Sequence, residues 1–320
     1  MWLRRIFRPA DSSSIAADSS PRPGGGMVKI YLPPQAFSQL NRLRLNASRY
    51  LPGMATGSRP SLRRKPAFDF REHRTYVPGD DIRYVDWKAS ARQEHIFVKQ
   101  GEQPKEVPVY LLLDCSASMR WGEPPKHTKA LQFVAALGYL ALAQGDRLVV
   151  QPLSSLSVQH LGPISGKGQV PALLNYLRSL SFQGGCDLIQ SIRQLTQRAR
   201  GGLTLIISDL LESNDLAKAL ELLPAPAWDV VVFHLLHPQE LQPALQGDFQ
   251  MIDIESGKKI NYDVDAKTLQ MYQQRIDAWR NDLEMVCIEN NAFYALIQAD
   301  WSLENEIIPY LRAVHVVSPS

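Results

Sequence analysis

The chain has 320 residues, of which 45% are hydrophobic, 21% charged and 8% aromatic, a composition typical of a folded globular protein. This excludes global disorder, a collagen-like repeat and a small disulfide-stapled fold, and the length allows about two domains. The net charge of +3 indicates no particular partner. Three widely spaced cysteines, Cys115, Cys186 and Cys287, predict reduced thiols and a cytoplasmic protein.

The charge is distributed unevenly along the chain. Residues 1–105 contain 19 Lys and Arg and 9 Asp and Glu, a net charge of +10, whereas residues 106–320 contain 16 and 23, a net charge of −7. Such asymmetry indicates two parts that behave differently. The basic part is either an arm that binds an anionic polymer or a membrane surface, or a segment that docks on the acidic domain of the same chain. We favour docking.

The N-terminal third has little periodic patterning. Residues 1–26 end in a Pro- and Gly-rich run and predict a disordered tail, without the continuous apolar core of a secretory signal. Residues 27–105 form a basic segment, in which Gln35–Leu45 has the apolar spacing of a short helix. No apolar run reaches the roughly 20 residues that span a bilayer, so we expect no transmembrane segment.

From residue 106 to residue 320, apolar runs alternate with helical patterns. The runs predict strands at Val107–Leu113, Arg147–Leu153, Leu203–Ser208, Asp229–Leu236 and Ala292–Ile297. The spacing predicts helices at Lys126–Gln144, Val170–Leu180, Asp187–Arg200, Leu216–Leu223, Ala266–Leu283 and Leu303–Leu311. Uniformly apolar strands separated by helices predict an α/β fold, a doubly wound and mostly parallel sheet with both faces covered.

Polar side chains follow two of these strands. Asp114, Ser116 and Ser118 alternate in the loop after the first strand, and Asp209 follows Leu203–Ser208. In a doubly wound sheet, sites form at the carboxyl ends of the strands. Carboxylates and hydroxyls form an oxygen-only set that suits Mg²⁺ or Mn²⁺. The alternative is that Asp and Ser only cap turns and helices here.

A second interpretation of the same strand ends is a serine hydrolase. Ser116 follows the first predicted strand, Asp209 follows a later one and His237 follows the next, which is the order that α/β-hydrolases use. However, the nucleophile elbow requires Gly-x-Ser-x-Gly, and Asp114 and Ser118 occupy the flanking places. A carboxylate beside the nucleophile would also oppose the developing oxyanion. We therefore favour a site without catalytic residues.

A dense motif of mixed charge lies in the basic segment. Its residues of interest are Tyr76, Asp80, Asp81, Arg83, Asp86, Trp87 and Arg92. They predict either a partner-facing surface with aromatic anchors or an ion-pair network that holds the basic segment to the acidic domain. The alternating signs favour the ion-pair network. Acidic residues interrupt the arginines, so we expect no specific nucleic-acid binding.

The two motifs in this order resemble a known family. The segment Tyr76–Arg92 resembles the bacterial family called domain of unknown function 58, and Asp114-Cys-Ser-Ala-Ser118 with Asp209 resembles the metal-ion-dependent adhesion site of von Willebrand factor A domains. The resemblance implies a Rossmann-like sheet, a divalent ion held by Asp114, Ser116, Ser118 and Asp209, and a link with MoxR-type AAA+ ATPases as a substrate or partner adaptor.

One residue departs from the family pattern. The family's third loop supplies a Thr after two glycines, but here Gly184-Gly185 is followed by Cys186. A neutral thiol is a poor ligand for the hard ion Mg²⁺. Asp187 can replace it, although Asp at this place is more typical of a helix cap. We therefore expect a non-enzymatic protein-interaction module with an altered metal site and no small-molecule substrate.

Overall fold

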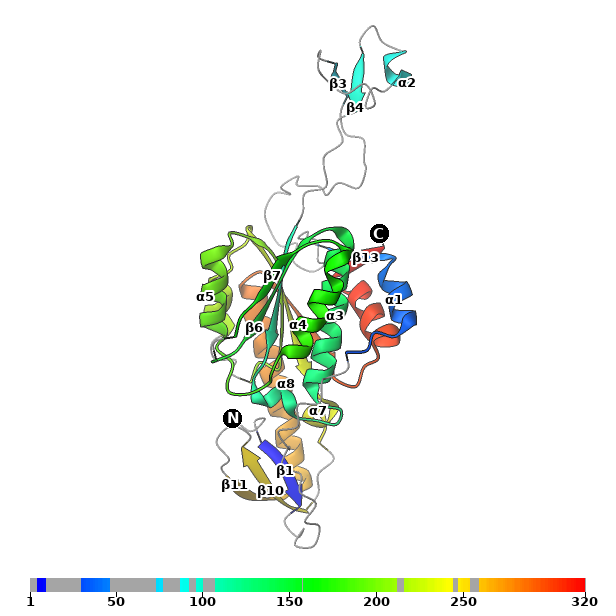
Figure 1. Ribbon diagram of the computed structural model, residues 1–320. Helices are drawn as coiled ribbons and strands as arrows, with labels where there is room; N and C mark the ends of the chain where they lie inside the picture. The colour runs from blue at the N-terminus through cyan, green and yellow to red at the C-terminus, as the bar shows by residue number, and fades with distance from the viewer. Residues whose placement is uncertain are drawn as a thin grey trace. The chain divides into compact units, whose positions relative to one another are not determined.

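The computed structural model describes residues 5–9, 30–46, 73–76, 87–91, 96–99, 107–156, 158–211, 216–243, 247–253 and 259–319. The chain divides into two compact units (Figure 1). The larger unit contains Met1–Ala55 and Val107–Ser320, and the smaller contains Thr56–Glu106. The start of the basic segment, including the helix α1 (Pro34–Leu40), therefore belongs to the same unit as the acidic domain.

The larger unit contains a six-stranded sheet with the order β12-β9-β8-β5-β6-β7. Its strands are β5 (Pro108–Asp114), β6 (Arg147–Leu153), β7 (Leu161–Ile164), β8 (Gly202–Ser208), β9 (Trp228–Leu236) and β12 (Ala292–Gln298). All neighbours are parallel except β7, which runs antiparallel to β6 at one edge. The predicted mostly parallel sheet is confirmed.

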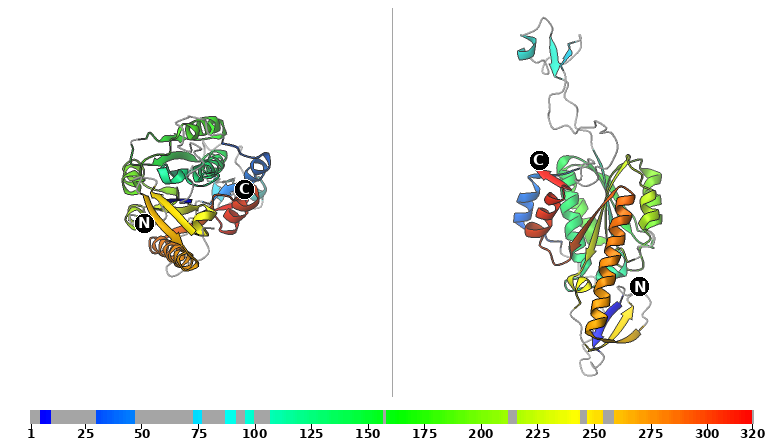
Figure 2. Two further views of the ribbon diagram at one scale, coloured as in Figure 1. Left: turned by 90° about the horizontal axis from the view of Figure 1, so that it is seen from below. Right: turned by 180° about the vertical axis from the view of Figure 1, so that it is seen from behind.

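Helices cover both faces of the sheet. They are α3 (Lys126–Gln144), α4 (Val170–Ser179), α5 (Leu188–Arg198), α6 (Leu216–Glu221), α7 (Pro238–Leu241), α8 (Ala266–Glu289) and α9 (Ile308–Ala313). Side chains alternate along each strand, so each face of the sheet has its own core. The helices α1, α3, α4 and α9 contribute to one core, and α5, α6 and α8 contribute to the other (Figures 1 and 2).

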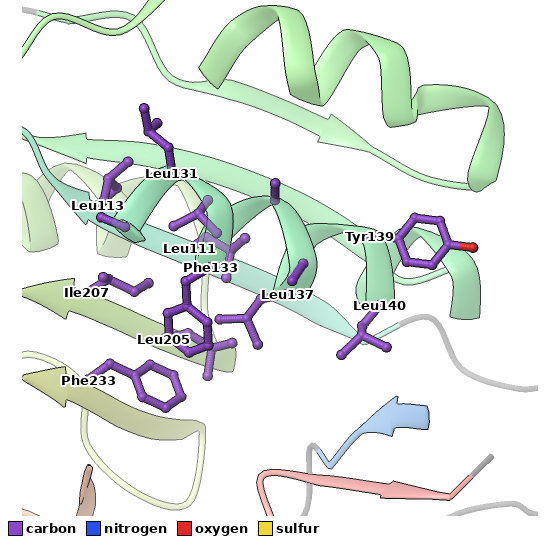
Figure 3. Close-up of a cluster of buried hydrophobic side chains, with 14 of the residues drawn as sticks. Leu111, Leu113, Leu131, Phe133, Leu137, Tyr139, Leu140, Leu205, Ile207 and Phe233 are labelled. Atoms are coloured by element: carbon purple, nitrogen blue, oxygen red, sulfur yellow. The ribbon is translucent and has the colours of Figure 1, made fainter. Parts of the chain in front are cut away.

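The core under α3 is the larger of the two. Leu111 and Leu113 of β5 point to α3 together with residues of β8 and β9 (Figure 3). Phe133 of α3 meets Phe233 of β9 edge to face, with ring centroids 4.8 Å apart. Because α3 is buried around most of its circumference, a fully buried charged residue on it is exceptional.

Three predicted helices differ from the structure, one of them being Ala266–Leu283, which continues to Glu289 as α8. The predicted helix Gln35–Leu45 ends at Leu40, and Leu43–Leu45 instead forms β2, which pairs with β13 (Val317–Pro319) near the C-terminus. Leu43 and Leu45 alternate in the sequence and are both buried, as strand residues are. The predicted helix Leu303–Leu311 begins as a π-helix at Leu303–Ile307 and continues as α9, whose second residue, Pro309, has no N–H to donate.

Part of the expected N-terminal tail is ordered. Arg5–Pro9 forms β1, which pairs antiparallel with β10 (Gly247–Asp253), and β10 pairs with β11 (Lys259–Val264). The prediction of disorder is wrong for these five residues, because a hairpin edge offers backbone partners that composition does not reveal. The rest of 1–26 lies outside the described residues.

The smaller unit contains three described elements. β3 (His73–Thr75) pairs antiparallel with β4 (Phe97–Lys99), and α2 (Trp87–Ser90) is one turn of helix. The docking of this part on the larger unit stays a prediction. Among the helices of the described ranges, none is long and apolar enough to cross a bilayer.

Candidate functional site

The four predicted ligands come from two adjacent strands. β5 ends at Asp114, and the loop after it carries Ser116 and Ser118, the latter in the first turn of a 3-10 helix. β8 ends at Ser208, and Asp209 follows. Because β5 and β8 pair in parallel, with Leu113 opposite Ile207, their carboxyl ends lie side by side. The structure thus brings together the predicted residues, which we call the strand-end cluster: Asp114, Ser116, Ser118 and Asp209.

Hydrogen bonds connect the strand-end cluster. Asp114 accepts from the backbone N–H of Ser116 at 2.8 Å and from the hydroxyl of Ser208 at 2.5 Å. The hydroxyls of Ser116 and Ser118 lie 2.9 Å apart, and Ser118 is close enough to the Asp209 carboxylate to help lower its pKa. All these side chains are buried. The cluster is therefore a connected polar network at the end of the sheet, and Ser208 is a member that the sequence analysis did not identify.

A buried lysine adjoins the strand-end cluster. Lys126, the first residue of α3, is 0% exposed, and its ammonium donates to Asp209 at 2.8 Å and to Glu240 of α7 at 2.7 Å. Burial would lower the pKa of Lys126, but the charges of Asp209 and Glu240 outweigh burial and raise it. Lys126 is therefore a permanent cation inside the protein. The sequence analysis missed it, although a charged residue on a mostly apolar helix was a detectable signal.

The second lysine partner is itself held in place. Glu240 also accepts from the backbone N–H of His237 at 2.7 Å, which completes a capping box at the start of α7. The backbone carbonyl of Glu240 accepts from the hydroxyl of Tyr272 on α8. Burial raises the pKa of Glu240, and the charge of Lys126 opposes that rise. The ion pair thus connects α3, α7 and the loop after β8.

His234 lies in β9, next to Asp209. Its Nε2 is 3.1 Å from the backbone carbonyl of Asp209, and its Nδ1 is 2.6 Å from the hydroxyl of Tyr294. Burial lowers the pKa of His234 to about 3, so the ring is neutral. A carbonyl can only accept, so Nε2 carries the proton and Nδ1 accepts from Tyr294. His234 therefore positions the backbone at Asp209 and has no charge to contribute.

The two cluster carboxylates are in different electrostatic states. Burial, then the negative charge of Asp209, raises the pKa of Asp114 to about 6, although hydrogen bonds from Ser116 and Ser208 oppose the rise. Burial would also raise the pKa of Asp209, but Lys126 outweighs it and holds that pKa below its usual range. Among the described residues, Asp114 thus has no compensating cation of the kind that Lys126 provides for Asp209.

The net charge around the strand-end cluster is compatible with a bound divalent cation. When ionised, Lys126 and Glu240 cancel, and the two cluster carboxylates remain with a charge of −2. The available donors are carboxylate and hydroxyl oxygens, which hard divalent ions prefer. Within the described ranges, no three His, Cys, Asp or Glu side chains gather to hold a metal, so an ion here would depend on the serine hydroxyls. In donor type and charge the strand-end cluster fits Mg²⁺ or Mn²⁺.

The loop that begins with Gly184-Gly185, where the family pattern places a Thr ligand, lies beside the strand-end cluster. The carbonyl of Gly184 accepts from the N–H of Ala117 at 2.9 Å, and Ser155 bonds to Gly185 through both its backbone and its hydroxyl. Gly184 has a φ of +72°, and an added Cβ would lie 3.1 Å from the Ser155 hydroxyl oxygen, so a side chain there is strained. The loop is therefore fixed against the β5 end.

The sequence analysis left open whether Cys186 or Asp187 in this loop contributes to an ion site, and the two residues have different environments. Asp187 caps α5, since its side chain accepts from the N–H of Gln190 at 2.9 Å. The helix-cap interpretation of Asp187 is confirmed. Cys186 is partly buried and packs against the core beneath α5 and α8. Whether its thiol contributes to an ion site stays a prediction.

The structure also places the residues of the hydrolase interpretation. The His237 ring accepts from the N–H of Gln239, approaches the carbonyl of Glu123 and stacks edge-on against Trp121. The hydroxyl of Ser116 bonds to that of Ser118. In the described part of the chain, none of the His237 hydrogen bonds reaches Ser116.

Of the mixed-charge motif, the structure describes two of the selected residues. Tyr76 follows β3 and is partly buried, with its N–H donating to the carbonyl of Ile96 at 2.7 Å. Trp87 begins α2 and is 63% exposed. The other selected residues lie outside the described ranges: Asp80, Asp81, Arg83, Asp86 and Arg92. Neither interpretation of this motif is decided.

Residues 72–282 match the family described as "Protein of unknown function DUF58". The chain belongs to this family. The chain is 26% identical over 258 residues to uncharacterized proteins of Mycobacterium bovis, Mb1516, and of Mycobacterium tuberculosis, Rv1480, covering 78% of this chain and 80% of each relative. The family membership that the two motifs suggested is confirmed.

Solved structures similar to this DUF58 protein are of the von Willebrand factor A type. BatB from Bacteroides thetaiotaomicron is 16% identical, covers 65% of this chain and 98% of its own, and has a TM-score of 0.39. The SpRpn10 VWA domain is 10% identical, with 64% and 95% covered and a TM-score of 0.36. These likenesses concern the fold, which in this chain has a mostly parallel six-stranded sheet.

Proposed function

We propose that this protein is a non-enzymatic interaction module that captures a protein partner at the strand-end cluster through a divalent cation. Asp114, Ser116, Ser118 and Asp209 would hold the ion, and a carboxylate of the partner would complete its coordination. The observation that carries the proposal is the excess charge of −2 on a connected, oxygen-only cluster at adjacent strand ends. The ion would supply the positive charge that Asp114 lacks.

The neighbouring residues support this role by fixing geometry. Lys126 and His234 hold Asp209 by its carboxylate and its backbone carbonyl, and Gly184 holds the β5 loop through Ala117. A site whose groups are already ordered loses less entropy when a partner binds. The family resemblance indicates the partner class, and we propose a MoxR-type AAA+ ATPase.

The sharpest test removes the serine hydroxyls and keeps both carboxylates. Asp209 is a poor choice for substitution because its loss would leave Lys126 with one partner. We expect Ser116→Ala/Ser118→Ala to fold, because the hydroxyls bond chiefly within the cluster, and to lose partner capture. The measurement is affinity capture from the native cell, with and without EDTA, read for an AAA+ ATPase.

The control for this experiment is Ser38→Ala, which removes an exposed hydroxyl that bonds only to a carbonyl within its own helix. Capture by the wild type and by this control should be equal and should disappear with EDTA. Capture of the ATPase that survives both EDTA and the double substitution would contradict the proposal. Circular dichroism checks that the double variant is folded.

Cys186 provides a second test of the ion. If the residue after Gly184-Gly185 reaches the ion, a hydroxyl should serve Mg²⁺ better than a thiol does. We expect Cys186→Thr to tighten Mg²⁺ binding, whereas Cys186→Ala should change it little. Calorimetric titration of the three proteins with Mg²⁺ measures this. An unchanged affinity in Cys186→Thr would show that residue 186 does not reach the ion.

A further inference from the structure

The long helix α8 has one face buried against the sheet. Ile276, Leu283 and Cys287 are buried, and Tyr272 and Trp279 are partly buried beside them. These positions recur every three or four residues and pack against β9 and β12 and the adjacent helix α6. Figure 2 shows α8 on the outside of the sheet, so its opposite face points away from the core.

The opposite face of α8 carries a second, uncharged row. Its members are Met271, Gln274, Ala278, Asn281, Met285 and Ile288, all exposed. The spacing alternates between three and four residues, which is the a and d pattern of a helix that pairs with another helix. Met271, Met285 and Ile288 are 48%, 53% and 51% exposed, which is unusual for large apolar side chains on one helix face.

The row is long enough for a helical partner. From Met271 to Ile288 it covers about five turns, or roughly 26 Å at 1.5 Å per residue. A strict seven-residue repeat drifts around a straight helix by about 20° per heptad, so the row stays on one side of α8 over this length. Methionine adapts its shape to different partners, which suits a binding surface.

Acidic residues flank the uncharged row. Arg275, Asp282 and Glu289 lie along one side, and Asp277 and Glu284 lie along the other, all of them exposed. Asp277 is paired with the partly exposed Arg280 at 3.7 Å. Toward the C-terminal end of α8, the flanks still carry Asp282, Glu284 and Glu289, whereas Arg275 lies nearer the middle of the helix. A second copy of this helix would bring like-charged flanks together, whereas a helix with basic flanks would complement them.

From this arrangement we propose that the outward face of α8 binds an amphipathic helix of a partner protein, with an apolar stripe flanked by Lys and Arg. The apolar stripe would cover Met271, Met285 and Ile288, and the basic flanks would face the carboxylates. This surface is separate from the strand-end cluster and needs no metal ion. It gives the protein a second binding site besides the proposed one.

The test uses the full chain and a synthetic helical peptide with Leu at its a and d positions and Lys and Arg at its flanks. Fluorescence anisotropy should show binding to the wild type. Met285→Glu/Ile288→Glu should weaken it by roughly tenfold or more, equivalent to about 1.4 kcal/mol or more. Ala278→Glu, which removes no large side chain, should also weaken it, because it places a charge in the centre of the row.

Three controls separate this site from general attraction between a basic peptide and acidic residues. Leu156→Glu changes a side chain of similar exposure (47%) outside α8 and should leave affinity unchanged. A scrambled peptide of the same composition and a peptide with Glu flanks should bind far more weakly. Equal binding of the scrambled peptide, no binding of the designed one, or equal affinity for all variants would overturn the proposal.

Sedimentation velocity tests whether a second copy of this chain covers the outward face of α8 instead. We expect the wild type to be monomeric in the absence of peptide. A dimer that Met285→Glu/Ile288→Glu dissociates would show that a second copy covers this face, and would overturn the proposal of a basic partner helix.

Discussion

Lys126→Met is expected to destabilise the larger unit by about 3–5 kcal/mol, because removing one partner of a buried ion pair leaves the other charges uncompensated. Met has nearly the length and volume of Lys, so the packing at the start of α3 is preserved. Asp209 and Glu240 would remain buried, with the ammonium at 2.8 and 2.7 Å gone. Chemical denaturation of the wild type and the variant near neutral pH measures the difference.

Two comparisons show whether the loss comes from the ion pair. Lys267→Met removes an exposed lysine on α8 and should change stability by no more than about 0.5 kcal/mol. Adding Glu240→Gln to Lys126→Met should recover part of the loss, since one uncompensated carboxylate disappears. If Lys126→Met were as stable as Lys267→Met, the buried carboxylates of Asp209 and Glu240 would not need the charge of Lys126 to compensate them.

Much of the fold could be predicted because five of the six strands of the central sheet are mostly apolar, whereas the short edge strand β7, with Gly and Pro in it, was not predicted. The predicted helix Lys126–Gln144 has the bounds of α3, and the predicted strand Arg147–Leu153 has those of β6. The short pairings could not be predicted. The paired residues of β2 and β13 are 272 to 276 positions apart in the chain, and each strand is three residues long, so their pairing depends on tertiary contacts that local patterns do not contain.

The candidate site was predictable only where it follows the strands. Asp114 and Asp209 could be placed together because neighbouring parallel strands end at one edge of the sheet. Lys126 and Glu240 come from helices, and a helix residue has no fixed position relative to a strand end until the helix packs. Their contact joins positions 114 residues apart and is visible only in the folded chain.

The ion pair also changes how the strand-end cluster is understood. From the sequence, Asp114 and Asp209 were two equivalent carboxylates, each a candidate ligand. In the structure Lys126 lies against Asp209 and lowers its pKa, whereas among the described residues no cation contributes to the pKa of Asp114. The two residues should therefore respond differently to substitution, and Asp114 is the one whose charge costs stability without an ion.

For this reason, Asp114→Asn is expected to stabilise the protein at neutral pH in the absence of divalent ions. Asn keeps the hydrogen bonds, since its oxygen accepts from the N–H of Ser116 and its amide can donate to the hydroxyl oxygen of Ser208. The folded pKa of Asp114 is about 6, and its unfolded pKa is about 3.8. The folded state therefore binds the Asp114 proton more tightly than the unfolded state does. The contribution of Asp114 to wild-type stability should be highest below about pH 4 and should fall as the pH rises through about 6.

Denaturation curves of the two proteins from about pH 4 to about pH 7 measure this effect, which is on the order of 3 kcal/mol in total. Asp114→Asn has no carboxylate to titrate at residue 114, so its advantage over the wild type should grow with pH and level off above about 6. Added Mg²⁺ should reduce that advantage at neutral pH, because the ion stabilises only the ionised carboxylate of the wild type. Parallel curves for the two proteins, unchanged by Mg²⁺, would mean that the charge of Asp114 is already compensated within the fold.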